Sequence, residues 1–319
     1  MNMGGWAAPG WLPGAHLQTI YPAVLAPTPR VAYRRERWIT PDDDFVDVDF
    51  TDPAPDDPRH LVVLFHGLEG CSGSHYARGL MQAAGEAGWL GAVVNFRGCS
   101  GEINRAPRAY HSGDSAEIAW ALARLADRYP AVQRHAVGVS LGGNALLKWA
   151  GEAGESGQRL VQSLAAISPP QDLQAGAVAL SSGFNLVYMR HFLQTLRRKS
   201  LQKLEQYPGL FDRDRLMAAR NFFDFDDAVT APMHGFAGCH DYWTRSSCKP
   251  LLADVRVRTL VVNALNDPFL PAHHLASAAQ VSSTVTLCYP DTGGHVGFLG
   301  SAFPGSMLGF GQRLLKWLA

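Results

Sequence analysis

The sequence predicts an α/β fold in which a mostly parallel sheet of roughly eight strands is covered by helices on both faces. Short, nearly continuous runs of Val, Leu and Ile alternate with amphipathic stretches, and strands that are apolar on both sides need helices on both sides. A chain of 319 residues, 47% hydrophobic and 18% charged, is long enough for one such domain with an insertion. The alternation stops once, after the sixth expected strand, and the insertion is expected there.

Six strands are expected over residues 34–168. The first two form a hairpin, and the acidic TPDDD between them is interpreted as a solvated turn. The helix over residues 115–130 places Ile118, Leu122 and Leu125 on one face. The expected strands cover residues 34–40, 45–50, 60–67, 90–96, 135–140 and 161–168, and a further helix covers 75–88.

A helical cap is expected over residues 171–250, because the strand and helix alternation is absent there and resumes only at residue 258. Residues 1–170 and 251–319 then form the core, and the second of these segments supplies strands over 258–265 and 285–290 and an amphipathic closing helix that ends in RLLKWLA.

The cap contains a helix-like stretch over residues 186–204, with Met189 and Phe192 on its apolar side. We expect these two residues to contact the substrate. The same stretch is rich in Arg and Lys, so a peripheral contact with a membrane surface is one interpretation. The alternative is a solvated cap whose cations are balanced by the acidic run at residues 224–227.

Composition excludes several classes of partner. Lys plus Arg and Asp plus Glu both number 28, so no net charge favours nucleic acid, and a small molecule is the expected partner. The five cysteines are widely spaced and form no CxxC, which argues against a disulfide scaffold and a zinc site. No signal peptide and no apolar run of about 18 residues is found, so we expect a cytoplasmic location without an integral membrane segment. Oligomeric state is not predicted.

The sequence Gly138-Val139-Ser140-Leu141-Gly142 follows the strand over 135–140 and leads directly into a helix. It fits GxSxG, in which a serine on a sharp strand-to-helix turn is exposed for nucleophilic attack. A phosphate-binding loop occupies a similar position, but its middle glycine is replaced by the serine. Ser140 is therefore the candidate nucleophile, and an ordinary tight turn is the alternative.

A serine hydroxyl needs a base within hydrogen-bond reach and an acid that orients the base. Asp267 follows the strand over 258–265, and His295 follows the strand over 285–290, in the chain order Ser, Asp, His. Both lie at strand carboxyl ends, at the edge of the sheet where Ser140 is expected. Asp172, after the sixth strand, is the rival for the acid, and Asp291 is interpreted as a turn residue.

Attack on a carbonyl also requires N–H donors for the developing oxyanion. The Leu141 amide is one candidate, and the loop after the third strand offers the Leu68 amide, with Glu69 in reserve. His66 in the same loop is expected to be structural. His273 and His274 show no ligand spacing, so neither a metal nor a cofactor is expected.

Seven segments resemble, in chain order, the YheT-like branch of the α/β-hydrolases: HGLEGCSGSHY, NFRGCSGE, YHSGD, GVSLGGN, FDDAVTAPMHGF, NDPF and GGHVGF. The amino-terminal PGAHLQTIYP is similar to that branch's HLQT segment, so the resemblance covers nearly the whole chain. It implies an α/β-hydrolase fold, hydrolysis of carboxylic esters, and a triad of Ser140, Asp267 and His295. Residues 97–102 and 110–114 either line the pocket or fix a loop, and the second interpretation is favoured. Residues 225–236 lie at the end of the cap and are interpreted as its hinge.

Three functions are compatible with these features. The first is a serine carboxylesterase that acts on esters of small to medium acyl chain through an acyl-enzyme on Ser140. The second is an acyltransferase that passes the acyl group to an alcohol. The third is a binding protein that keeps the hydrolase scaffold without turnover. The first two differ only in the access of water to the acyl-enzyme.

Overall fold

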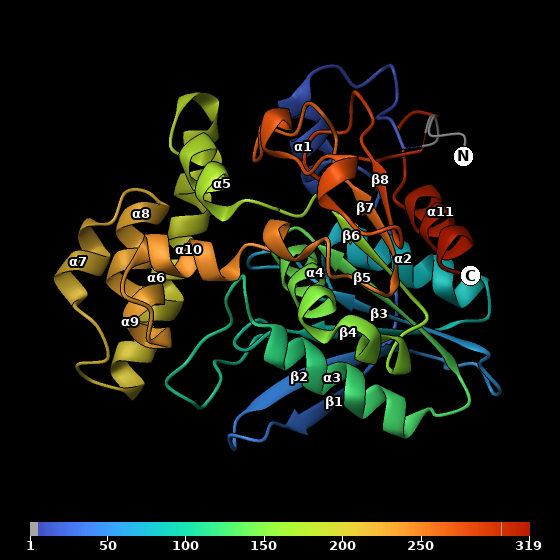
Figure 1. Ribbon diagram of the computed structural model, residues 1–319, viewed down its shortest axis with the longest axis horizontal. Helices are drawn as coiled ribbons and strands as arrows, with labels where there is room; N and C mark the ends of the chain where they lie inside the picture. The colour runs from blue at the N-terminus through green and yellow to red at the C-terminus, as the bar shows by residue number, and fades with distance from the viewer. Residues whose placement is uncertain (1–5, 301) are drawn as a thin grey trace.

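The computed structural model describes residues 6–300 and 302–319 and contains one eight-stranded sheet (Figure 1). The strand order is β1-β2-β4-β3-β5-β6-β7-β8, in which β1 and β2 are antiparallel neighbours and β2 is antiparallel to β4. All remaining pairs are parallel, so the predicted, mostly parallel sheet is confirmed. The strands are β1 Tyr33–Ile39, β2 Phe45–Thr51, β3 His60–Phe65, β4 Leu90–Asn95, β5 Gln133–Val139, β6 Ser163–Ile167, β7 Arg258–Val262 and β8 Val285–Cys288.

Helices cover both faces of the sheet. Helices α3 and α4 lie on one face, and α2 and α11 lie side by side on the other (Figure 1). Amphipathic α3 corresponds to the helix predicted over 115–130. The helices of the core are α1 Ala15–Val24, α2 His75–Glu86, α3 Ser115–Arg128, α4 Leu141–Ala153 and α11 Leu308–Leu318.

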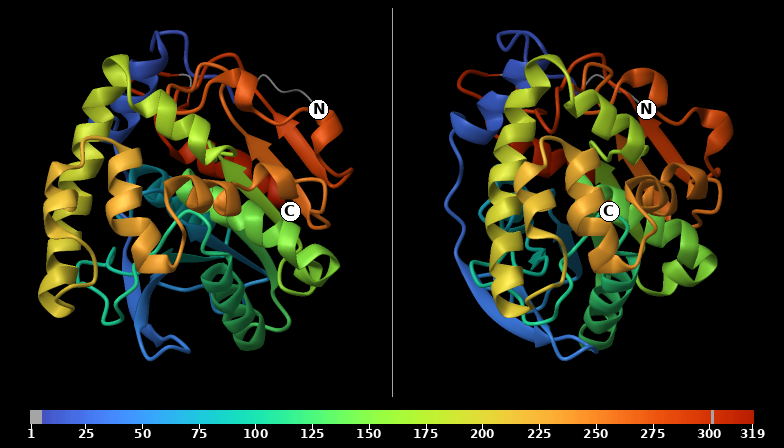
Figure 2. Two further views of the ribbon diagram at one scale, coloured as in Figure 1. Left: turned by 60° about the vertical axis from the view of Figure 1, so that its left-hand side comes forward. Right: turned by 90° about the vertical axis from the view of Figure 1, so that its left-hand side faces the viewer.

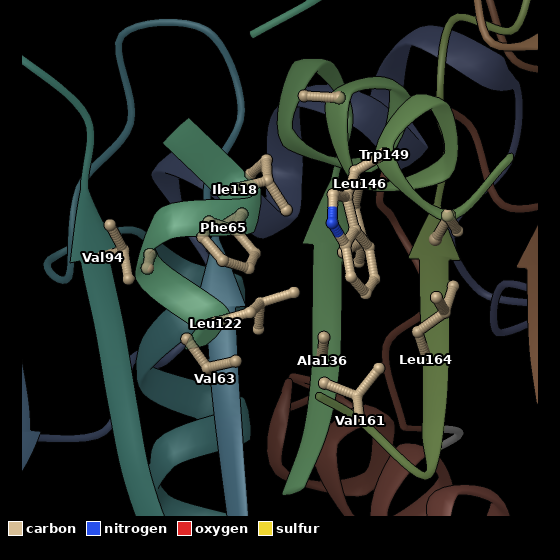
Figure 3. Close-up of a cluster of buried hydrophobic side chains, with 14 of the residues drawn as sticks. Val63, Phe65, Val94, Ile118, Leu122, Ala136, Leu146, Trp149, Val161 and Leu164 are labelled. Carbon is tan, nitrogen blue, oxygen red and sulfur yellow. The ribbon is translucent and has the colours of Figure 1, made fainter. Parts of the chain in front are cut away.

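The apolar runs of the strands supply two hydrophobic cores because alternate residues point to opposite faces. In β3, Val63 and Phe65 join Ile118 of α3 and the residues of α4 around Leu146 (Figure 3). Val62 and Leu64 of the same strand point to the other face and pack with residues of α2 and α11. Each fully buried side chain of this size contributes roughly 1.5–3 kcal/mol. A strand must be apolar at every position to serve both cores, which explains the continuous pattern in the sequence.

Strands β3 and β5 are neighbours whose connections leave in opposite directions, β3 toward β4 and β5 toward β6. In open α/β sheets, such a reversal leaves a crevice beyond the carboxyl ends of the two strands. The loop that contains Leu68 follows β3, and Ser140 follows β5, so both reach this crevice.

Between β6 and β7 the chain forms a group of helices that stands to one side of the sheet (Figures 1 and 2). The expectation of helices inserted after the sixth strand is confirmed, and the predicted helix over 186–204 is α6. Division of the chain into a core and a cap over residues 171–250 stays a prediction. The helices are α5 Leu173–Leu180, α6 Leu186–Gln206, α7 Arg213–Ala218, α8 Phe222–Phe225, α9 Ala231–His234 and α10 Cys239–Ser246. No helix in the described part of the chain is long and apolar enough to cross a bilayer.

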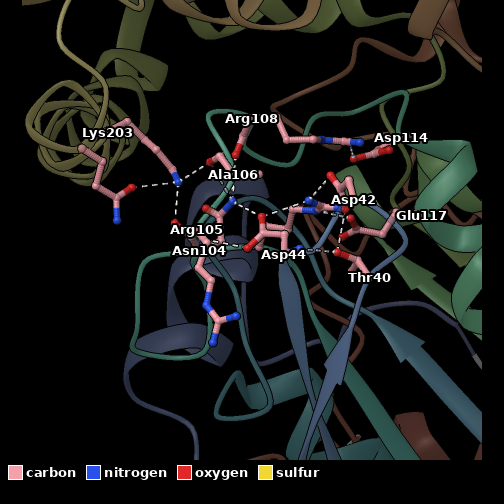
Figure 4. A network of polar contacts seen from close by, with 12 residues as sticks. Thr40, Asp42, Asp44, Asn104, Arg105, Ala106, Arg108, Asp114, Glu117 and Lys203 are labelled. Atoms are coloured by element: carbon pink, nitrogen blue, oxygen red, sulfur yellow. Dashed lines mark hydrogen bonds and ion pairs between the residues drawn. The ribbon is translucent and has the colours of Figure 1, made fainter.

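The acidic turn between β1 and β2 is not simply solvated, contrary to the interpretation from sequence. The Asp44 side chain is fully buried, and Arg97 Nη1 donates to Asp44 Oδ2 at 2.9 Å and to Asp42 Oδ2 at 2.7 Å. Arg97 Nε also donates to Glu117 of α3 at 2.5 Å. Figure 4 shows that the network continues through the loop after β4 to Lys203 of α6. This network ties the hairpin, α3 and α6 together.

Arg97→Met is expected to lower the free energy of unfolding by about 3–5 kcal/mol, because it leaves the buried carboxylates of Asp44 and Glu117 without their cation. Urea unfolding of both proteins measures the difference. Arg59→Met is the control, because Arg59 is exposed and its side chain makes no ion pair within residues 6–300 and 302–319. A loss in Arg97→Met no larger than in the control would show that the network does not stabilise the fold.

Candidate active site

The turn between β5 and α4 holds Ser140 in a left-handed backbone conformation. Ser140 has φ 52° and ψ −120°. Such a conformation costs a non-glycine residue about 1–3 kcal/mol. The flanking glycines make room for it: a Cβ on Gly138 would lie 2.5 Å from the Gly142 carbonyl oxygen, and one on Gly142 would collide with the Phe65 and His66 carbonyls. The hydroxyl therefore stands at the carboxyl edge of the sheet.

Hydrogen bonds connect Ser140 to His295 and His295 to Asp267. His295 Nε2 lies 2.9 Å from Ser140 Oγ, and His295 Nδ1 lies 2.9 Å from Asp267 Oδ2. Because a carboxylate accepts, the proton on the imidazole belongs on Nδ1, and Nε2 is free to accept from the hydroxyl. The residues follow β5, β8 and β7, whose ends share one edge of the sheet. The structure thus brings together the three residues that the sequence puts forward.

Burial and stacking hold the acid and the imidazole in place. The Asp267 side chain is 1% exposed and that of His295 is 11% exposed. The second carboxylate oxygen, Asp267 Oδ1, accepts from the Phe269 amide at 2.8 Å. The Phe269 ring stacks on the His295 ring with 4.2 Å between the centroids. The imidazole therefore has little freedom to turn away from Ser140.

The two backbone amides that the sequence suggests as oxyanion donors both lie beside Ser140. The Leu141 and Leu68 N–H groups donate to no acceptor within the described residues. A Cβ on Gly67 would lie 3.1 Å from the Ser140 Cβ, so the glycine lets the Leu68 loop approach the serine closely. Gly67 is fixed in turn by its own amide, which donates to Tyr76 Oη at 2.9 Å.

Glu69 and His66 of the same loop make hydrogen bonds of their own. The Glu69 amide donates to Tyr110 Oη at 2.8 Å, so it is not free to serve as the reserve oxyanion donor. His66 is fully buried, and its Nε2 accepts from the Phe96 amide at 3.0 Å. Burial lowers the pKa of His66 to about 4, so the imidazole is neutral. It joins the ends of β3 and β4, in keeping with the structural role expected for it.

The other acidic and histidine residues considered from the sequence do not contact Ser140 or His295. Asp172 caps α5, where its Oδ1 accepts from the Ala175 amide at 2.9 Å, and its side chain is 34% exposed. Asp291 is exposed. The rings of His273 and His274 lie with their centroids 4.2 Å apart and their planes tilted by 43°. Across residues 6–300 and 302–319, no group of three or more His, Cys, Asp and Glu side chains could hold a metal ion.

A largely apolar cavity opens at Ser140 and His295 and extends under the helices between β6 and β7. Phe192 lines this cavity, together with Leu180 of α5. Met189 does not: it is fully buried, and it packs inside a hydrophobic cluster with Leu193 and residues of the neighbouring helices. The structure therefore brings only one of the two expected substrate contacts to the cavity.

Helix α1 supplies two residues that sequence reasoning did not single out. Gln18 Oε1 accepts from Asn266 Nδ2 at 2.8 Å and from the Gly293 amide at 3.0 Å. Thr19 Oγ1 accepts from the His295 amide at 2.9 Å. Gln18 therefore joins the loop of Asp267 to the loop of His295. The available signal was the adjacent amide and hydroxyl side chains of the HLQT segment.

Comparisons with known proteins agree with this fold and site. Residues 60–302 match the family described as alpha/beta hydrolase fold. Over 306 residues the chain is 36% identical to "Putative esterase YheT" of Escherichia coli, which covers 95% of this chain and 89% of that protein. The chain therefore belongs to the alpha/beta hydrolase family, and is a hydrolase of its YheT-like branch.

More distant relatives carry other names. Human "Phospholipase ABHD3" is 28% identical over 295 residues, which are 90% of this chain and 72% of that protein. "Monoacylglycerol lipase" of Saccharomyces cerevisiae is 26% identical over 273 residues, 83% of this chain and 59% of that protein. Among solved structures, the Pyrococcus furiosus esterase Pf2001 has a TM-score of 0.58 at 13% identity and covers 90% of this chain and 92% of its own, a likeness of fold alone.

Gln18→Leu is expected to lower kcat about 10-fold to 100-fold with KM within a few-fold of the parent, because loss of the shared acceptor lets the two loops move apart. Gln18→Glu keeps an acceptor oxygen and should recover part of kcat. Steady-state kinetics on p-nitrophenyl butyrate measure both.

The matched control is Gln202→Leu, on an exposed position of α6. Thermal melting separates a loss of positioning from a loss of folding. An unchanged kcat in Gln18→Leu, or an equal loss in Gln18→Glu and Gln18→Leu, would contradict the role of this amide oxygen.

Proposed function

We propose that this protein is a serine carboxylesterase that hydrolyses carboxylic esters of small to medium acyl chain through an acyl-enzyme on Ser140. The observation that carries the proposal is the hydrogen-bonded chain of Ser140, His295 and Asp267. Ser140 lies on a strained turn, and two amides without acceptors lie beside it. The name of the relative YheT also supports it.

The mechanism follows from the contacts. Ser140 Oγ attacks the ester carbonyl while its proton passes to His295 Nε2, and the Leu68 and Leu141 amides stabilise the oxyanion. Collapse of the tetrahedral intermediate expels the alcohol, which takes the proton from His295. Water then attacks the acyl-enzyme, with His295 as base, and releases the acid and free Ser140. Asp267 stabilises the imidazolium in both steps.

The cavity wall matches the acyl part of such a substrate. Leu180, Phe192 and Leu196 come from α5 and α6, and all three line the cavity that Ser140 opens into. Each methylene buried against such a wall contributes about 0.8 kcal/mol. An acyl chain lying along these helices therefore gains affinity with length until the wall ends.

A fluorophosphonate probe should label the parent on Ser140, and Ser140→Ala should abolish both labelling and hydrolysis of p-nitrophenyl butyrate. Intact-protein and peptide mass spectrometry locate the label. Ser156→Ala, at an exposed position of the 3-10 helix Gly154–Arg159, is the control and should behave as the parent. Persistent labelling of Ser140→Ala at another side chain, with activity retained, would refute the assignment.

Asp267→Asn should lower kcat by about 10²–10⁴-fold, because an amide cannot hold the tautomer in which His295 Nε2 accepts a proton. Asp172→Asn should leave kcat within a few-fold, since Asp172 caps α5 and does not contact His295. Steady-state rates of the two variants show which of the two carboxylates orients His295. The reverse ranking would transfer the orienting role to the residue after β6.

A further inference from the structure

The stripe of α6 that lines the cavity changes from apolar to cationic along the helix. Its residues, at helical spacing and in chain order, are Phe192, Leu196, Lys199 and Lys203. The Phe192 ring lies 6.1 Å from that of Phe269, which stacks on the His295 imidazole. Lys203 follows roughly 16 Å further along the helix axis, at 1.5 Å per residue. The apolar wall that begins beside the catalytic base therefore ends in ammonium groups.

Lys203 has no carboxylate partner among the residues that the structure describes. Its ammonium donates to the carbonyl oxygens of Asn104 at 2.6 Å and Ala106 at 2.7 Å, and to Gln206 Oε1 at 3.1 Å (Figure 4). The residue is only 2% exposed. Burial lowers the pKa of Lys203 to about 8, so the group is still largely charged at pH 7. Lys203 is thus a buried positive charge that only neutral oxygens contact.

Lys199 places a second ammonium at this end of the cavity. It pairs with Glu69 Oε1 at 2.9 Å and donates to Cys99 Sγ at 3.2 Å. Because an ammonium has three protons, one N–H of Lys199 has no acceptor within residues 6–300 and 302–319. Two ammonium groups therefore share a single carboxylate, and the cationic end of the stripe has room for another anion.

The other charged side chains of the cavity wall do not neutralise this end. Arg97 is bonded to three carboxylates of the network described above. Asp226 accepts from Thr230 Oγ1 at 2.6 Å and from Trp243 Nε1 of α10 at 2.8 Å. Asp226 contacts neither lysine, so it leaves their charge without a counter-ion.

Resting on the proposed esterase function, we propose that Lys199 and Lys203 bind a carboxylate at the far end of the acyl chain. An acyl chain that starts at Ser140 and runs along the apolar part of the stripe reaches these two ammonium groups. Gln206 is exposed and its bond to Lys203 is the longest of the three, so a carboxylate oxygen can take its place. Such a bond is charge-assisted and stronger than the one it replaces. The substrate class is therefore the half-ester of a dicarboxylic acid.

The test measures kcat/KM for monomethyl esters of unbranched dicarboxylic acids of four to eight carbons. Each is compared with the methyl ester of the monocarboxylic acid of equal length. Methanol leaves from both, so the ratio of the two kcat/KM values isolates recognition of the free carboxylate. The parent should prefer the half-ester at one chain length or more.

In Lys203→Met this ratio should fall about tenfold, the effect of losing about 1.4 kcal/mol of interaction with the carboxylate. Lys203→Arg keeps the positive charge and should recover part of the preference. Lys316→Met, at an exposed position of α11, is the matched control and should keep the ratio of the parent. Thermal melting shows whether each variant is folded.

Two results would overturn the inference. A parent that prefers the methyl ester of the monocarboxylic acid at every length would contradict it, whether or not the Lys203 variants fold. An equal loss on both esters in folded Lys203→Met would mean that the lysine only supports the structure.

Hydrolysis of p-nitrophenyl butyrate by the same parent separates this inference from the proposed function. If the folded parent hydrolyses p-nitrophenyl butyrate but shows no preference for half-esters, the carboxylate subsite alone is wrong. If it hydrolyses none of these esters, the proposed function is wrong and the subsite falls with it.

Discussion

The close approach of α4 to the end of β3 is the constraint on which the rest of the site depends. A side chain on Gly142 would collide with the carbonyl oxygens of Phe65 and His66, so only glycine lets α4 begin there. That start forces the preceding Ser140 into a left-handed conformation. Burial of apolar side chains in the two hydrophobic cores, between the sheet and helices α2, α3, α4 and α11, offsets the free-energy cost of this strain.

Around this fixed serine, separate parts of the chain supply partners through directed hydrogen bonds. The amino-terminal helix α1, which precedes the region that matches the family, joins the loop of Asp267 to the loop of His295 through Gln18. Helix α6 contacts the loop after β3, which carries Leu68 and Glu69, through the ion pair of Lys199 with Glu69, and Glu69 has φ 56°. The helices between β6 and β7 are therefore bonded to the loop that carries the proposed oxyanion donor Leu68, in addition to covering the cavity.

The sequence predicts the residues that local pattern defines. Ser140 stands in a spaced glycine motif, while Asp267 and His295 follow apolar strands whose carboxyl ends share an edge. The hydrogen bond between Gln18 and Asn266, in the loop of Asp267, joins residues 248 positions apart, and no local pattern predicts such a contact. Helical spacing likewise identifies an apolar face on α6 but does not show that Met189 packs inside the cluster and not against the cavity.

The central claim is that Ser140 forms a covalent acyl-enzyme. The most direct test is rapid mixing of the parent with p-nitrophenyl butyrate, followed by an acid quench and peptide mass spectrometry. This activated ester is expected to acylate the serine faster than the acyl-enzyme is hydrolysed. We predict a burst of p-nitrophenol close to one equivalent per protein, with the butyryl group on the peptide that contains Ser140. Steady turnover with no butyrylated Ser140 at any quench time, or a butyryl group on a different side chain, would contradict it.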